Sequence, residues 1–192
     1  MNTSILQWNI QGLSGKKDEL LDLINTCNAS IIALQETKLS NDYLTKISKY
    51  SVISKEGHYN QGYHGGVALY IHPDVIHSKI DLNTPCQAVA AVVALSFRFT
   101  ICNIYSPPSL PLNKQLLSDI FQQLPSPCLI VGDFNANSLL WGSANTNTRG
   151  RSIEAFLAEN NLNILNDGSP TRIAISSETA IDLSFCSPSI FF

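Results

Sequence analysis

Polar side chains that can handle a metal ion or a phosphate lie at the ends of apolar segments of the sequence. Asn9, Glu36, Tyr105 and Asp133 each end or directly follow such a segment, and Asn135 comes two residues after Asp133. Polar groups just past the carboxyl ends of strands are where α/β proteins assemble their sites. A carboxylate with amide and other oxygen ligands suits Mg²⁺, for which Mn²⁺ can substitute. The pattern predicts a magnesium site held by Glu36 with help from Asn9.

Signatures of other chemistries are missing from the sequence. It has no His/Cys cluster with zinc spacing, no GxxxxGK[ST] phosphate loop and no GxSxG nucleophile elbow. Its five cysteines are scattered, without a CxxC pair. This usage is typical of a reducing compartment, so we expect a nuclear or cytoplasmic protein.

Composition and charge narrow the function further. Apolar residues make up 44% of the 192 residues and charged residues 14%, which excludes a disordered chain, a coiled coil and a collagen-like repeat. Twelve Lys and Arg against fifteen Asp and Glu give a net charge of −3. Nucleic-acid binding by bulk positive charge is therefore not expected, whereas a local basic patch or metal ions remain compatible. No run approaches the roughly 18 apolar residues that span a bilayer, and the first residues lack the order of a secretion signal, so no membrane partner is expected.

Hydrophobic periodicity predicts the elements that must position these side chains. The first strand, helix and second strand should form a βαβ unit. The β-rich middle of the chain, flanked by helical segments, predicts an α/β fold of two packed sheets covered by helices, in one domain over residues 1–192. We expect strands over 4–10, 30–34, 65–71, 86–95, 97–105, 128–131, 162–165 and 179–185, and helices over 16–28, 112–124 and 151–161.

Short motifs occur along the chain in an informative order. They are LQWNIQG at 6–12, LQETK at 34–38, GGVA at 65–68, NIYSP at 103–107 and GDFN at 132–135, followed by LWGS at 140–143, RGR at 149–151 and IDLSFCSP at 181–188. Together they resemble the endonuclease/exonuclease/phosphatase superfamily. The later motifs look like the apurinic-type endonuclease domain of jockey-like non-LTR (LINE-type) retrotransposons. The resemblance covers almost the whole chain.

The resemblance implies a fold, an activity and partners. The fold is a DNase I-like, four-layer αββα sandwich of two mixed sheets flanked by helices. The activity is Mg²⁺-dependent phosphodiester hydrolysis that nicks DNA, exposing a 3′-hydroxyl for target-primed reverse transcription. The partners are double-stranded DNA and, in a longer protein, the element RNA and a reverse transcriptase region.

The resemblance also implies roles for individual residues. Glu36 is similar to the principal metal ligand, with Asn9 beside it. Asp133 corresponds to the carboxylate that activates the attacking water, and Asn135 to the amide that holds that carboxylate and the phosphate. Tyr105 resembles the phenol that donates to the scissile phosphate, although a tyrosine at this place can also be only a packed ring.

Two departures from the family pattern stand out. Gln11 occupies a position where DNA-repair relatives carry an acid. Asp182 resembles the acid that orients a histidine, but no Ser-Asp-His segment follows it, and the last histidine is His77. The pattern is that of a C-terminally incomplete domain, unless His58 or His64 substitutes.

Two other functions are therefore kept as alternatives. One is a catalytically inactive relict that binds DNA weakly. The other is a superfamily phosphatase acting on inositol phosphates or sphingolipids, which the LWGS and RGR motifs disfavour.

DNA contacts are expected from a few residues near the proposed site. Lys38 follows the LQETK glutamate, and Arg149 and Arg151 lie beside the polar loop over 136–148, just after its end. They are candidates for phosphate contacts. Trp141 lies in the same loop, where it is either a core residue or a wedge that contacts DNA.

Overall fold

The chain opens with a strand, a helix and a strand. The computed structural model describes residues 4–39, 46–57, 65–174 and 177–190. β1 (Ser4–Asn9) and β2 (Ala29–Gln35) pair in parallel and are joined by α1 (Lys17–Cys27), which confirms the predicted βαβ unit. Asp18 and Glu19 lie in the first turn of α1, where acids complement the helix dipole.

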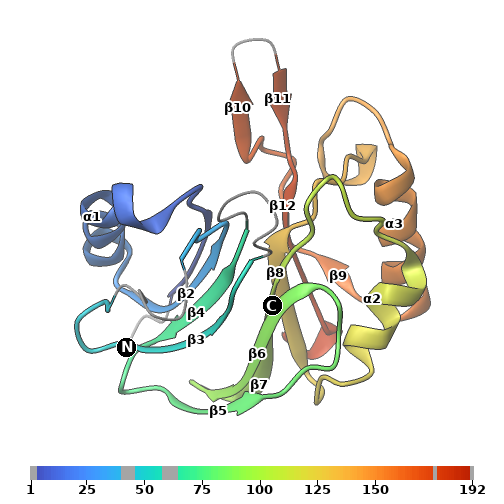
Figure 1. The fold of residues 1–192 in the computed structure, drawn as a ribbon. Coiled ribbons are helices and arrows are strands. Elements are labelled where there is room, and N and C mark those ends of the chain that lie inside the picture. Colours follow the sequence, from blue (N-terminus) through green and yellow to red (C-terminus); the bar gives the residue numbers. More distant parts are fainter. Residues whose placement is uncertain (1–3, 40–45, 58–64, 175–176, 191–192) are drawn as a thin grey trace.

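Two mixed sheets form the body of the molecule (Figure 1). The smaller has the order β1-β2-β4-β3, with β3 (Ser51–Lys55) and β4 (Val67–Ile71) antiparallel to each other. The larger has the order β5-β6-β7-β8-β12-β9. Its strands are β5 (Ile76–Ile80), β6 (Gln87–Ala94), β7 (Arg98–Tyr105), β8 (Cys128–Asp133), β9 (Asn163–Ile164) and β12 (Asp182–Cys186).

Two further helices and a two-stranded ribbon, besides short 3₁₀ turns, complete the described fold. α2 (Lys114–Phe121) connects the parallel strands β7 and β8, and α3 (Thr148–Glu159) lies between β8 and β9 in the sequence. β10 (Arg172–Ala174) and β11 (Ser177–Thr179) form an antiparallel ribbon that projects beyond both sheets (Figure 1). Within the part of the chain that the structure describes, no helix combines the length and apolarity needed to cross a bilayer.

Three buried clusters separate the layers. One contains Leu20 and Ile24 of α1 with the outer face of the small sheet, and a second fills the space between the two sheets. The third joins the outer face of the large sheet to α2 and α3, including Phe156. The resulting order of helix, sheet, sheet and helices is the predicted αββα sandwich (Figure 1).

A buried amide pair fastens the two sheets together. Asn103 of β7 donates to the carbonyls of Leu34 (2.9 Å) and Ala68 (3.0 Å) in the small sheet. Its own Oδ1 accepts from Gln35 Nε2 at 2.6 Å. Since Gln35 is the last residue of β2, this pair fixes the end of that strand relative to the large sheet.

The predicted boundaries differ from the observed ones where capping decides them. Asn147 accepts from the Gly150 amide (2.8 Å), so α3 starts at Thr148 and not at Arg151. Asn113 caps α2 in the same way. The pattern missed β3, β5, β10 and β11; β3 and β5 are edge strands, whose mixed sequences lack clear alternation.

Candidate active site

The strand ends bring the predicted catalytic residues to one edge of the sandwich. Asn9 ends β1, and Glu36 directly follows β2, its parallel neighbour. In the large sheet, Asp133 pairs with both Tyr105 at the end of β7 and Asp182 at the start of β12. The two sheets thus contribute one group of polar side chains, as their positions in the sequence predict.

The Asn9 amide links the two sheets at this edge. Its Nδ2 donates to Glu36 Oε1 at 2.9 Å and to Asp133 Oδ2 at 2.7 Å. Because one amide group satisfies an oxygen of each carboxylate, it holds two like charges close together. Asn9 is therefore the residue that defines the distance between Glu36 and Asp133.

Asp133 is a buried carboxylate with fixed orientation. Its Oδ1 accepts from the Asn135 backbone amide at 2.8 Å. Burial raises the pKa of Asp133, an effect that the hydrogen bonds from Asn135 and Asn9 oppose and the charge of Glu36 reinforces. A carboxylate with a raised pKa is a better proton acceptor, which suits activation of a water molecule.

Tyr105 has its ring buried and its hydroxyl in the cleft. Burial, followed by the charge of and a hydrogen bond to Glu36, raises the pKa of Tyr105, so its phenol stays protonated at neutral pH. Asn135 donates from Nδ2 to the Ser106 carbonyl at 3.3 Å, which directs that side chain toward the segment after Tyr105. Both residues can donate hydrogen bonds to a bound phosphate.

Asp182 is the least satisfied of the acids. Its Oδ1 is buried and has no hydrogen-bond partner among the described residues. Burial and then the charge of Asp133 raise its pKa to about 6, while Thr171 and, more weakly, Arg172 act in the opposite direction. An acid in this state needs a positive or hydrogen-donating partner.

Glycines determine the local backbone at two of the motifs. A Cβ at Gly132 would collide with the Ile104 carbonyl, so the close approach of β8 to β7 requires glycine before Asp133. After β2, the amides of Thr37 and Lys38 donate to the carbonyls of Gly66 (3.1 Å) and Gly65 (2.8 Å). These bonds fix the turn that carries Glu36.

The side chains line a cleft of about 510 Å³. Its walls include every predicted catalytic and metal-binding residue, together with Gln11, Thr171 and Arg172. The donors are oxygens, and burial first, followed by the negative charge crowded there, raises the pKa values of Asp133 and Asp182. A divalent cation would relieve that crowding, so the donor set fits Mg²⁺ or Mn²⁺.

The residues predicted to contact DNA do not lie together in the structure. Lys38 Nζ lies 3.8 Å from Glu36 Oε2. Arg149 donates to the carbonyls of Phe134, Ser106, Pro107 and Leu110, at 2.9, 2.7, 3.3 and 2.7 Å respectively. Its guanidinium therefore holds the loops behind the cleft and is not free for a phosphate.

Trp141 and Arg151 also lie away from the cleft. Trp141 is fully buried and donates to the Ala136 carbonyl at 3.1 Å, so the interpretation as a DNA wedge is wrong and the core interpretation holds. Arg151 is exposed on α3 and bonds the Thr146 carbonyl at 3.1 Å. In the RGR motif, Gly150 packs so closely on the Asn137 carbonyl that no side chain fits.

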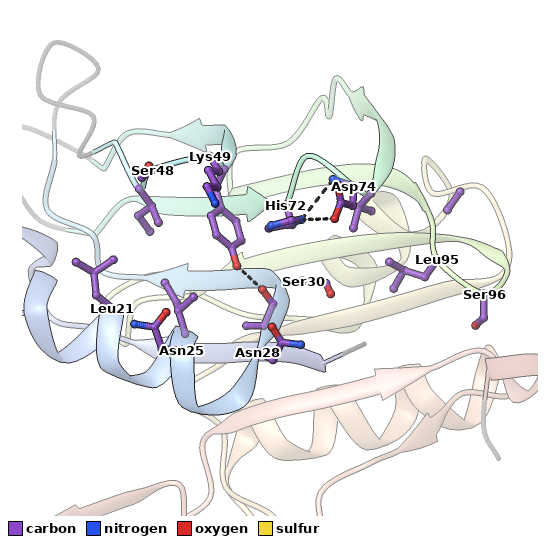
Figure 2. Close-up of a pocket in the computed structure, with 16 residues that line it drawn as sticks. Leu21, Asn25, Asn28, Ser30, Ser48, Lys49, His72, Asp74, Leu95 and Ser96 are labelled. Atoms are coloured by element: carbon purple, nitrogen blue, oxygen red, sulfur yellow. Dashed lines mark hydrogen bonds and ion pairs between the residues drawn. The ribbon is translucent and has the colours of Figure 1, made fainter. Parts of the chain in front are cut away.

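None of the histidines that the structure describes lines the cleft. His58 and His64, the expected substitutes for a terminal histidine, lie outside the described residues. His77 lies in β5, the edge strand of the large sheet. His72 directly follows β4 and lines a separate cavity of about 710 Å³ (Figure 2). There Tyr50 packs edge-on against His72, whose Nδ1 lies 3.5 Å from Asp74 Oδ2. This larger cavity contains no predicted catalytic residue.

Sequence reasoning missed Arg172, Thr171 and Asn103. The first two belong to the unpredicted ribbon and its approach, where neither periodicity nor a motif drew attention. Asn103 stands inside an apolar strand, and a polar residue at such a position was a signal that something must satisfy it.

The chain is similar in sequence to proteins of known family. Residues 99–192 match the family described as Endonuclease-reverse transcriptase. The chain is 24% identical over 180 residues to the probable RNA-directed DNA polymerase from transposon X-element of Drosophila melanogaster, covering 90% of the chain and 19% of that relative. It is 23% identical over 168 residues to the RNA-directed DNA polymerase from mobile element jockey of the same species, covering 85% and 18%. The chain thus spans about a fifth of these relatives.

A solved structure has the same fold over nearly the whole chain. It is the endonuclease domain of TRAS1, a telomere-specific non-LTR retrotransposon, with a TM-score of 0.79 and 22% identity, covering 96% of this chain and 84% of that one. The predicted resemblance is confirmed. The chain is homologous to the RNA-directed DNA polymerases of jockey-like mobile elements, matches the endonuclease-reverse transcriptase family over residues 99–192, and has the fold of a non-LTR retrotransposon endonuclease domain.

Proposed function

We propose that the chain is a DNA-nicking domain that hydrolyses a phosphodiester with the help of Mg²⁺ or Mn²⁺. The observation that carries the proposal is the Asn9 amide, which bridges Glu36 and Asp133 between the two sheets. Such a pair of carboxylates at a cleft edge suits a phosphate ester, because charge neutralisation and positioning dominate its cleavage. The homologues support a role in exposing the 3′-hydroxyl that primes reverse transcription in a larger protein.

Each residue has a part that its surroundings support. Glu36 and Asn9 would hold the metal ion, which supplies charge stabilisation to the phosphate when bound. Asp133, oriented by the Asn135 amide, accepts a proton from the attacking water. Tyr105 remains protonated and donates to a phosphate oxygen, and the Asn135 side chain keeps that phosphate in place.

A second candidate is supported by a specific observation. Asp182 Oδ1 lacks a partner among the described residues, and neither described histidine lines the cleft. A domain in this state would bind DNA with little or no cleavage. The five free cysteines support a reducing compartment, nuclear or cytoplasmic, for either candidate.

Nicking of supercoiled plasmid separates the candidates. We expect the chain to convert supercoiled to open-circular DNA only with Mg²⁺ or Mn²⁺, and Asp133→Asn to lose about 10² to 10⁴ in rate. Asp119→Asn, an exposed acid on α2, is the matched control and should nick like the parent chain.

The outcomes are distinct. Metal-independent nicking, or nicking that survives Asp133→Asn, would exclude the proposed mechanism. DNA binding without nicking in either metal would favour the inactive candidate.

A further inference from the structure

The cleft has a basic residue that the motifs do not indicate. Of the described residues that line it, Arg172 is the only lysine or arginine. Arg149 is engaged by backbone carbonyls behind the cleft, and Arg151 lies on the exposed side of α3. Lys38 lies outside this lining, beside Glu36 at 3.8 Å. Arg172 is therefore the positive charge that lines the part of the cleft beside Asp182.

The backbone at Arg172 is held firmly against the large sheet. The hydroxyl of the preceding Thr171 accepts from the amides of Ile181 and Asp182, both at 3.1 Å. The Thr171 amide donates to the Thr179 carbonyl at 3.0 Å, and Arg172 pairs with Thr179 in the ribbon. The guanidinium thus starts from an anchored point beside Asp182, although the side chain itself is exposed.

The charged groups of the cleft form a series from one sheet to the ribbon. Glu36 and Asp133 each contact Asn9, and Asp133 pairs across strands with Asp182. Arg172 lies at the far end of the series, where its charge acts on Asp182. Glu36, the proposed metal ligand, and Arg172 therefore stand at opposite ends of this series of charged groups, with Asp133 between them.

We propose that Arg172 is the phosphate anchor of the cleft, holding the backbone of the DNA strand at the ribbon side while Asp133 faces the bond to be cut. The inference rests on the proposed function. A guanidinium presents a planar fork of donors that matches two phosphate oxygens, and it keeps its charge at any physiological pH. Because Arg172 lies at the other end of the cleft from Glu36, its contact with a phosphate limits how far the DNA strand can shift past the acidic side chains.

Equilibrium binding tests the inference without any metal or cleavage. The probe is a fluorescein-labelled 20-base-pair duplex in EDTA, titrated by anisotropy between 50 and 200 mM KCl. We expect Arg172→Gln to weaken binding about tenfold at the lowest salt. It should reduce the slope of log K against log salt by about one unit, since one phosphate contact is lost. Arg172→Lys should retain the slope but not the full affinity, because lysine keeps the charge without the fork.

Arg98→Gln is the matched control. Arg98 begins β7, the strand that Tyr105 ends, so it lies roughly 23 Å from the cleft at about 3.3 Å per residue. The Arg98→Gln substitution removes the same charge from the chain. It should leave the affinity for the duplex and the slope of log K against log salt unchanged.

The outcomes separate this inference from the proposed function. The anchor is excluded if Arg172→Gln binds the duplex as tightly as the parent chain does, or if Arg98→Gln loses as much affinity as Arg172→Gln. The nuclease proposal stands in both cases. If the parent chain shows no salt-dependent binding at all, the proposed DNA substrate itself is wrong. In the nicking assay, the anchor predicts a rise in KM for Arg172→Gln that exceeds its loss in kcat.

Discussion

A single amide holds together two carboxylates that would otherwise repel each other. Asn9 satisfies Glu36 and Asp133 at once, while the other oxygen of Glu36, Oε2, pairs with the Lys38 ammonium at 3.8 Å. We predict that Glu36→Gln lowers Mn²⁺ affinity about tenfold or more, because a neutral amide replaces a charged hard ligand. Glutamine keeps the shape and can still accept from Asn9, so the cleft should persist.

Calorimetry or Mn²⁺ relaxation measures this change. Glu19→Gln, an exposed acid in the first turn of α1, is the control. Equal affinity in Glu36→Gln and the parent chain would remove Glu36 from the metal site.

Asp182 carries a residue-scale prediction about pH. Its pKa is raised to about 6 from an ordinary value of 3.8. The folded state therefore favours the protonated acid, so this contribution to stability is present below about pH 4 and lost as the pH rises through about 6. Asp182→Asn cannot ionise and should exceed the parent chain in unfolding free energy at pH 8, by about 1 to 3 kcal/mol.

Urea denaturation at pH 4 and pH 8 checks this prediction. The difference between Asp182→Asn and the parent chain should shrink toward pH 4, whereas exposed Asp22→Asn should show no such pH dependence. If the difference in unfolding free energy between Asp182→Asn and the parent chain does not change with pH, Asp182 ionises freely in the folded protein.

At the scale of elements, the ends of strands carry the site, and the Asn103–Gln35 pair keeps the two sheets in register behind it. We predict that Asn103→Ala lowers the unfolding free energy by about 2 to 4 kcal/mol, because it leaves a cavity and takes the donor from two buried carbonyls. Asn25→Ala, on the exposed side of α1, should change it by no more than about 0.5 kcal/mol. A small loss for Asn103→Ala would show that the sheets are held by apolar packing alone.

How much could be predicted from the sequence also differs between elements. Strands buried on both faces, such as β2 and β4, are continuous apolar runs, and the sequence predicted both. Glu36, which follows β2, lines the cleft. Edge strands such as β5 expose most side chains and follow no clear period. The LWGS and RGR motifs drew attention to Trp141 and Arg149, but a motif does not distinguish a residue that builds a loop from one that reaches substrate. Only the fold shows that both point inward.

At the scale of the whole molecule, the chemistry lies at one end of the sandwich. The carboxyl ends of β1, β2, β7 and β8 all meet at the cleft, while the larger cavity lies at the other end of β2. The ribbon of β10 and β11 projects beyond the two sheets (Figure 1). Arg172, the first residue of β10, also lines the cleft. Under the proposed function DNA would approach along this end, where Arg172 is the basic residue among the described ones that line the cleft.

The overall charge then predicts how DNA association responds to salt. A net charge of −3 supplies no general attraction, and the described cleft offers Arg172, with Lys38 close to Glu36. We predict weak binding of a duplex whose log K against log salt has a slope of about −2 to −4, since each phosphate contact releases roughly 0.9 counterions. Adding Mg²⁺ should strengthen binding at fixed ionic strength if the acids hold the ion. Tight binding with a slope near zero would instead mean that the partner is a small molecule or a protein, because only a polyanion imposes that dependence on salt.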